Sequence, residues 1–281
     1  MPRACLLLLW CLGSCGAQAA ELPQTVHFPS RDGTTELVGY LFEPQTPGPH
    51  AAVVLLHGRA GPYSSLAKGR YDAGTLSLRH KMWGRFWAEH GYVALLVDSF
   101  GPRGYAAGFP KHSYQDRPSG VSEQTTRPLD AYGALDFLRS RGDVLRDRIG
   151  VQGWSNGGMT VLATMAPHPP GLPDPTVATG FRAALALYPS CRIPSKQPDY
   201  RPYAPMLILV ASDDDEVSPT VCQSFVAAQK AQGADLDLVT YEGAHHSYDD
   251  PGKTKQSHEP NRRALADSLV RAEQFFARNL K

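Results

Sequence analysis

One serine in this sequence has the surroundings of an enzymatic nucleophile. Ser155 lies in the segment GWSNGG at 153–158, directly after the short apolar run Ile149–Gln152 and before a stretch of small residues. Between a strand and a helix, a G-x-S-x-G motif forms a nucleophile elbow, in which the serine occupies a strained turn and the glycines let the backbone pack closely. The motif alone occurs often by chance, but this context makes Ser155 a candidate nucleophile.

Polar loops that follow three further apolar runs offer partners for this serine. The loop HGRAG at 57–61 follows Ala52–Leu56, the acidic loop SDDDEVSP at 212–219 follows Met206–Val210, and YEGAHHSY at 241–248 ends the run Leu236–Tyr241. A histidine can take the serine proton, and a carboxylate can orient the imidazole. Serine, then acid, then histidine, each just after a strand, is the order of the catalytic triad in α/β-hydrolases.

Two backbone amides complete the predicted site. In this fold the oxyanion hole takes one N–H group from the residue after the nucleophile and one from the loop after an early strand. In this sequence these are the amides of Asn156 and Arg59. A glycine-rich loop after a strand would by itself be an ordinary turn, but the four features together predict a serine hydrolase.

Other interpretations of the same loops point to metal binding. The acidic loop could be a solvated loop or a weak calcium site, and His245 and His246 lie beside Asp249 and Asp250. Adjacent side chains point apart on an extended backbone, however, and no helical H-x-x-x-H pair is present. We therefore expect neither a metal nor a cofactor.

The order of elements predicts the fold that would position these loops. Short apolar runs occur at Leu37–Phe42, Ala52–Leu56, Tyr92–Val97, Ile149–Gln152, Ala183–Tyr188, Met206–Val210 and Leu236–Tyr241. Helical patterns occur at Arg79–His90, Thr126–Arg141, Gly157–Met165 and Val221–Gln232, and a last helix has an apolar stripe from Leu265 to Leu280. Continuously apolar strands that alternate with helices predict an α/β fold: a mostly parallel central sheet with helices on both faces, here the α/β-hydrolase fold. Such sheets bind ligands at the carboxyl ends of their strands.

The motifs resemble those of the dienelactone hydrolase family of α/β-hydrolases over most of the chain. The pieces that carry the resemblance are HGR at 57–59, VDSFGPRG at 97–104, the elbow at Ser155, the acidic loop and the segment 241–248. The family's last motif ends in a His-x-Phe-like sequence, which corresponds to 246–248 and implies that His246 is the base. The family acid follows a small residue at a strand end by about three positions, which implies Asp214; counting back from Pro219 gives Asp215 instead.

One position departs from the family pattern. Dienelactone hydrolase itself uses a cysteine nucleophile, whereas this sequence has Ser155. A neutral serine needs its histidine fully engaged, while a thiolate does not. The sequence therefore predicts a serine hydrolase of carboxylic esters or lactones, acting on a small-molecule ester. The alternatives are a small peptidase of the prolyl-oligopeptidase type and a non-catalytic ligand-binding module on a hydrolase scaffold.

The stretch 59–128 is longer than a simple crossover between strands. Its part Gly101–Thr125 is rich in Gly, Pro, Ser and Arg, which suits a loop or cap over the site. Arg103 and Arg127 are candidates for contact with a substrate carboxylate, and a structural ion pair is the more common role of such arginines.

Residues 1–19 have the composition of a secretory signal peptide. Arg3 gives a cationic start, Ala4–Leu12 is an apolar run too short to cross a bilayer, and AQA at 17–19 is a cleavage site. We expect an exported protein, periplasmic or secreted, with one hydrolase domain at 20–281. The sequence LGSC at 12–15 also resembles a lipobox, so anchoring by acylation of Cys15 is the alternative.

Two cysteines, Cys191 and Cys222, remain after removal of this segment. In an exported protein such a pair predicts a disulfide, and two buried free thiols are the alternative. The formal net charge of +1 over 281 residues gives no reason to expect nucleic acid or an anionic membrane as a partner. The sequence makes no prediction about the oligomeric state.

Overall fold

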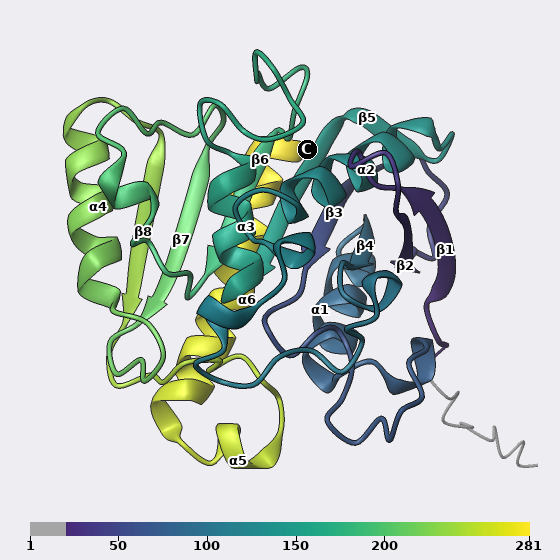
Figure 1. The fold of residues 1–281 in the computed structure, drawn as a ribbon, viewed down its shortest axis with the longest axis horizontal. Helices are drawn as coiled ribbons and strands as arrows, with labels where there is room; N and C mark the ends of the chain where they lie inside the picture. The colour runs from purple at the N-terminus through teal and green to yellow at the C-terminus, as the bar shows by residue number, and fades with distance from the viewer. Residues whose placement is uncertain (1–20) are drawn as a thin grey trace, which may run out of the picture.

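The computed structural model describes residues 21–281, so the predicted signal peptide and Cys15 lie outside the described residues. Eight strands form one sheet in the order β1-β2-β4-β3-β5-β6-β7-β8 (Figure 1). They are β1 Gln24–Pro29, β2 Glu36–Phe42, β3 His50–Leu56, β4 Tyr92–Asp98, β5 Val144–Trp154, β6 Ala183–Leu187, β7 Met206–Ala211 and β8 Leu236–Tyr241. From β4 to β8 all neighbouring strands are parallel, whereas β2 pairs antiparallel with both β1 and β4.

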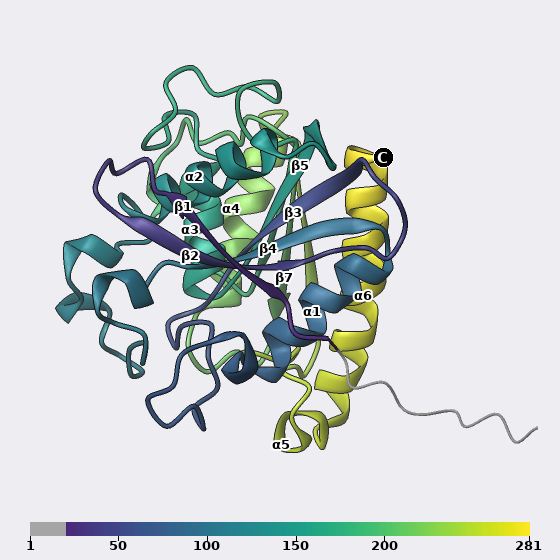
Figure 2. The same ribbon diagram turned by 90° about the vertical axis from the view of Figure 1, so that its right-hand side faces the viewer.

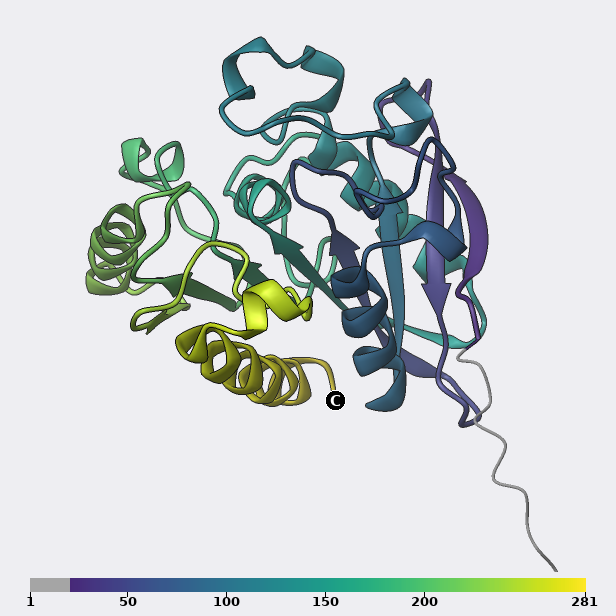
Figure 3. The same cartoon turned by 90° about the horizontal axis from the view of Figure 1, so that it is seen from below.

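Helices cover both faces of this sheet. They are α1 Leu78–Glu89, α2 Arg127–Ser140, α3 Asn156–Thr164, α4 Pro219–Ala231, α5 Lys253–Gln256 and α6 Glu259–Leu280. Short 3-10 helices lie at Ala73–Thr75, Gly101–Arg103, Tyr114–Asp116, Ser119–Val121 and Pro194–Lys196. Figure 2 shows α1 and α6 on one side of the sheet and α2, α3 and α4 on the other. In Figure 3, seen from below, the blue α1 and the yellow α6 again lie on the same side.

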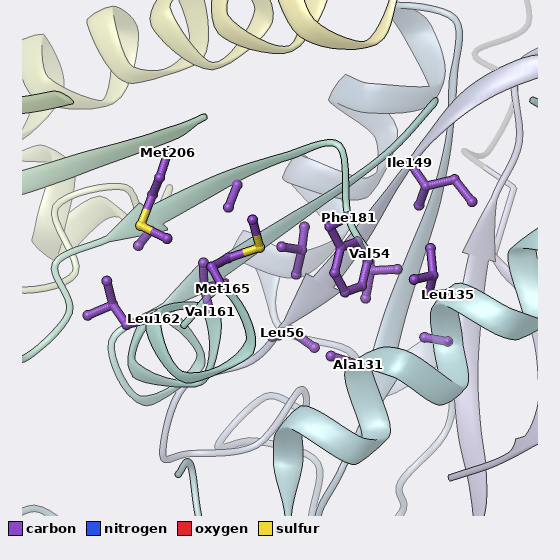
Figure 4. Close-up of a cluster of buried hydrophobic side chains, with 14 of the residues drawn as sticks. Val54, Leu56, Ala131, Leu135, Ile149, Val161, Leu162, Met165, Phe181 and Met206 are labelled. Carbon is purple, nitrogen blue, oxygen red and sulfur yellow. The ribbon is translucent and has the colours of Figure 1, made fainter. Parts of the chain in front are cut away.

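Each face of the sheet packs its own hydrophobic core. On one side, Val54 and Leu56 of β3 contact the group that includes Ala131 of α2 and Val161 of α3 (Figure 4). On the other side, Val53 and Leu55 of the same strand belong to a cluster with aromatic residues, among them Trp83, Trp87 and Phe276. Because successive residues of a strand point to opposite faces, a continuously apolar strand is what a sheet covered on both sides requires.

The structure confirms the predicted α/β-hydrolase architecture and extends the predicted elements. Strand β5 begins at Val144, five residues before the predicted run. The prediction missed this first part because it contains polar, exposed residues and so lacks an apolar run. Strand β1 and the short helix α5 were not predicted from the sequence. In β1 only Phe28 is fully buried, as expected of an edge strand, so its sequence lacks the apolar run that identified the others. Among residues 21–281, no helix is long and apolar enough to cross a bilayer.

Candidate active site

The turn between β5 and α3 holds Ser155 in a strained backbone conformation. Its φ is +52°, a region that residues other than glycine rarely adopt. The Ser155 N–H donates to the Leu187 carbonyl at the end of β6 at 2.9 Å. A Cβ on Gly157 would overlap the carbonyl oxygen of Leu56, so only glycine fits where α3 begins against β3. The elbow therefore places the Ser155 side chain at the carboxyl edge of the sheet.

Three side chains from three loops form one hydrogen-bonded line at this edge. His246 Nε2 lies 2.9 Å from Ser155 Oγ, and His246 Nδ1 lies 2.8 Å from Asp214 Oδ2. The side chains of His246 and Asp214 are only 4% and 1% exposed. Since Asp214 accepts from Nδ1, Nε2 is left to accept the Ser155 hydroxyl proton. This is the geometry of a serine activated by a general base.

The structure distinguishes Asp214 from its neighbour. Asp214 Oδ1 accepts the backbone N–H groups of Glu216 at 2.8 Å and Val217 at 2.9 Å, so the loop fixes this carboxylate toward His246. Asp215 points outward, is 59% exposed and pairs with Lys111 at 3.0 Å. Only Asp214 is therefore in position to orient the imidazole.

The two adjacent histidines also have different surroundings. The ring of His245 stacks on the ring of His258, with centroids 4.2 Å apart and planes 8° apart, and its backbone N–H donates to Asn261. His246 is held inside by a hydrogen bond from Lys255 Nζ to its carbonyl oxygen at 2.7 Å. Alternation of side chains along the loop thus separates them, as the sequence argument required.

The loop after β3 brings Arg59 to the nucleophile. A Cβ on Gly58 would lie 3.7 Å from the Cβ of Ser155, so this loop passes directly beside the serine. Within residues 21–281, neither the Arg59 N–H nor the Asn156 N–H has a protein acceptor outside regular secondary structure. Both amides are thus available to a ligand. The N-terminus of α3 lies at Asn156, and its partial positive charge favours a negatively charged ligand atom there.

His57 fixes the orientation of one of these amides. Its Nε2 accepts the Ser99 N–H at 3.2 Å, so its Nδ1 carries the proton and donates to the Gly58 carbonyl at 2.7 Å. Complete burial, helped by the charge of Arg127, lowers the pKa of His57 well below its usual value, so the ring is neutral. In a trans peptide the C=O and N–H groups point in opposite directions, and the Arg59 N–H therefore points away from His57.

The segment Gly101–Thr125, a loop or cap in the sequence prediction, contacts three loops beside Ser155. The Phe109 N–H donates to the Arg59 carbonyl of the loop after β3 at 2.8 Å, and the Arg59 side chain donates to the Phe109 carbonyl at 3.2 Å. Lys111 pairs with Glu216 of the acidic loop at 2.9 Å. Arg117 donates to the Asn156 side chain at 3.1 Å and pairs with the buried Glu123 at 2.8 Å. The segment Gly101–Thr125 thus contacts the loop after β3, the acidic loop and the start of α3.

Arg103 and Arg127, the candidates for contact with a substrate carboxylate, both have structural partners instead. Arg103 pairs with Asp32 at 2.7 Å and with the buried Asp130 at 2.8 Å. Arg127 is fully buried and donates to the His57 carbonyl at 2.7 Å. Both guanidinium groups thus have structural partners near the loop 57–61.

Glu216 is a site residue to which the sequence argument gave no role. Its Oε2 lies 3.9 Å from His246 Nε2, and both its oxygens accept from Arg59, at 3.1 and 3.2 Å. Burial alone would raise the pKa of Glu216, but Arg59, His246 and Lys111 lower it to about 2. The acidic run at 213–216 did not single out Glu216, because its partners Arg59, Lys111 and His246 all lie on other segments of the chain.

A disulfide joins Cys191 to Cys222, with their Cα atoms 5.1 Å apart, as the sequence predicted. Cys191 follows β6, and Cys222 lies in the first turn of α4, directly after the acidic loop. The bridge therefore anchors the end of the loop that carries Asp214.

Other features of the described residues do not compete with this site. A cavity of about 780 Å³ lies between the β1–β2 edge and the end of α1, and none of the triad residues lines it. Among residues 21–281, no group of three or more His, Cys, Asp or Glu side chains is arranged to hold a metal ion.

Comparison with known proteins agrees with the motifs. Residues 37–280 match the model of the dienelactone hydrolase family. The chain belongs to this family. With Ser155 at its elbow, it is a serine hydrolase of the α/β type.

Solved structures with the same fold include hydrolases of several kinds. Esterase 2 of Thermogutta terrifontis with bound propionate is 18% identical, with a TM-score of 0.59 over 90% of this chain and 95% of that one. A protein described as a dienelactone hydrolase from Klebsiella pneumoniae is 16% identical, with a TM-score of 0.65 over 90% and 99%. A protein described as a dipeptidyl aminopeptidase IV from Bacteroides ovatus is 21% identical, with a TM-score of 0.62 over 92% of this chain, which spans only 36% of that one. At these identities the likeness shows the fold alone.

Proposed function

We propose that the protein hydrolyses carboxylic esters or lactones through an acyl-enzyme on Ser155. His246, oriented by Asp214, takes the hydroxyl proton as Ser155 attacks the carbonyl carbon. The Arg59 and Asn156 amides stabilise the oxyanion that forms, and each such donor contributes about 3 kcal/mol to the stability of the transition state. His246 then gives the proton to the departing alcohol, and a water activated by the same imidazole releases the acid.

The observation that carries this proposal is the line of two hydrogen bonds from Asp214 through His246 to Ser155. Each residue comes from a different loop, and the line lies beside the loop of Arg59, whose N–H has no acceptor outside regular secondary structure within residues 21–281. A framework role would not require a serine at φ +52° with its hydroxyl bound to a buried imidazole.

Labelling with a fluorophosphonate probe tests the nucleophile. We expect one probe per wild-type chain, on the peptide that contains Ser155, and none on Ser155→Ala. Esterase 2 of T. terrifontis has been crystallised phosphorylated by paraoxon, which motivates this choice of probe. A wild-type protein that remains unlabelled while folded would support the non-catalytic alternative.

A panel of 4-nitrophenyl esters of increasing acyl length, aromatic lactones and amino-acid 4-nitroanilides tests the substrate class. We expect turnover of esters or lactones and little turnover of anilides. Faster cleavage of the anilides than of the matching esters would favour the peptidase alternative.

We also propose that the protein acts outside the cytoplasm. The predicted signal sequence supports export, and the buried bridge between Cys191 and Cys222 is typical of oxidising compartments. Amino-terminal sequencing of the mature protein tests this: a start at Ala20 fits the predicted cleavage site, and a start at an acylated Cys15 fits the lipoprotein alternative.

A further inference from the structure

A second buried carboxylate lies on the histidine loop and takes no part in the triad. Asp249 follows His246 by three residues and is completely buried. Its Oδ2 accepts from Trp83 Nε1 of α1 at 2.8 Å, and its Oδ1 accepts from the Tyr188 hydroxyl at 2.5 Å. Arg79 of α1 forms an ion pair with the same carboxylate at 3.0 Å. The Asp249 side chain is thus bound both by α1 and by the residue that follows β6.

Tyr188 connects this carboxylate to the catalytic groups. It directly follows β6, where the Leu187 carbonyl accepts the N–H of Ser155. The edge of its buried ring meets the imidazole of His246, with centroids 4.8 Å apart and planes 63° apart. Its backbone has φ +39°, and its N–H donates to Leu209 of β7 at 2.7 Å. The residue therefore contacts the base through its ring while its hydroxyl reaches beyond the imidazole to Asp249.

The loop itself needs an external support. Ser247, the residue after His246, has φ +60°, a conformation that costs free energy in a residue other than glycine. Asp214 and Ser155 hold the two nitrogens of the imidazole, but neither holds the backbone turn that carries it. The buried carboxylate of Asp249 keeps the turn in one arrangement through two hydrogen bonds and one ion pair. Losing either hydrogen bond would leave a buried carboxylate oxygen without a hydrogen-bond donor, which costs free energy.

We propose that Tyr188 and Asp249 are positioning residues for His246, an inference that rests on the proposed function. Tyr188 limits the tilt of the imidazole, and Asp249 fixes Tyr188 and the histidine loop to each other. Neither residue touches the substrate. Their contribution is to keep Nε2 aligned between the Ser155 hydroxyl and the oxygen of the departing alcohol, where a small displacement reduces the rate steeply.

The variant Tyr188→Phe removes one hydroxyl and keeps the ring. Tyr200→Phe is the matched control, because Tyr200 is also buried and its hydroxyl also makes one hydrogen bond, to Leu162 at 2.8 Å, but it does not contact the triad. Both variants and the wild type are assayed on the 4-nitrophenyl and the ethyl ester of the acid that the wild type prefers. A nitrophenolate leaves without a proton, whereas an ethoxide must receive one from His246.

We expect Tyr188→Phe to lower kcat/KM about 10-fold on the nitrophenyl ester and about 100-fold on the ethyl ester. KM for each ester should change by less than about threefold, and Tyr200→Phe should leave the ratio of the two esters unchanged. Asp249→Asn, which removes the charge that faces Arg79, should give the same pattern if it folds. Thermal unfolding shows which variants are folded at the assay temperature.

Equal losses on the two esters, or the same change of ratio in Tyr200→Phe, would overturn the inference while leaving the proposed function intact. A folded wild type that hydrolyses no ester and binds no fluorophosphonate would overturn the proposed function, and the inference with it. An unchanged rate in Tyr188→Phe would show that the ring alone suffices and that the bond to Asp249 has no positioning role.

Discussion

The buried contact between His246 and Asp214 and the exposed ion pair between Lys111 and Asp215 have similar lengths in different surroundings. His246 and Asp214 are 2.8 Å apart with side chains at most 4% exposed, whereas Lys111 and Asp215 are 3.0 Å apart with side chains 46% and 59% exposed. In water, screening and the entropy of long side chains reduce such a contact to about 0–1 kcal/mol. In a buried site, loss of one partner leaves the other without compensation. Neighbouring residues of one acidic loop should therefore differ greatly in their effect on activity.

The largest difference is expected between the inner and outer histidines. His246→Ala removes the proposed base, so we expect kcat to fall by a factor of about 1,000,000, as in Ser155→Ala. His245→Ala removes only the stack on His258 and should change kcat less than about threefold. Steady-state kinetics on one 4-nitrophenyl ester measures all three. Comparable losses of kcat in His246→Ala and His245→Ala would contradict the assignment of His246, and not His245, as the base.

The two aspartates should repeat this contrast. Asp214→Asn keeps the shape of the side chain but no longer fixes the required tautomer of His246, and we expect a fall in kcat of about 10,000-fold. Asp215→Asn weakens an exposed contact with Lys111 and should leave kcat within about twofold. The same ester assay measures both variants. The opposite order would mean that the triad acid is Asp215.

Removal of the disulfide tests how far the buried site depends on its framework. The bridge closes a loop with a sequence separation of 31 residues, so the double variant Cys191→Ala, Cys222→Ala should lose about 3–4 kcal/mol of stability in the chain-entropy model. Denaturant unfolding measures this loss. We expect kcat at low denaturant to change less than about threefold, because Asp214 is also held by two backbone N–H groups. A loss below about 1 kcal/mol would contradict the chain-entropy estimate.

The smallest expected effect concerns Glu216, which lies between the two regions. Its pKa is lowered from 4.5 to about 2, so its ionised form is bound more favourably in the folded state. The stability this provides is present above the unfolded pKa and is lost as the pH falls from about 5 to about 2. The difference in stability between wild type and Glu216→Gln should therefore shrink over this range. Unfolding at several pH values measures it, with the exposed Glu242→Gln as control. A difference in stability that stays constant between pH 5 and pH 2 would contradict the lowered pKa of Glu216.

Much of the fold was predictable because local pattern and long-range packing agree in it. Most of the parallel strands are continuously apolar, and all but β5 lie within two residues of their predicted bounds. The elbow at Ser155 was predictable for the same reason, since Gly153 is required by local backbone contacts within the elbow and Gly157 by the close approach of β3. Strand β1 was missed because an edge strand is buried mainly through Phe28.

The chain itself determined which residues could act as nucleophile, base and acid, because motif order along an α/β sequence fixes which loops reach the carboxyl edge of the sheet. Only the tertiary structure decided which neighbour faces inward at that edge. Two backbone N–H groups hold the Asp214 carboxylate toward His246, whereas the Asp215 carboxylate is exposed and pairs with Lys111. Tertiary packing likewise brought Asp249 into contact with Tyr188, Trp83 and Arg79, which lie 61 to 170 residues away in the sequence. Such contacts depend on how α1 and β6 pack around the loop, and a one-dimensional pattern does not contain that information.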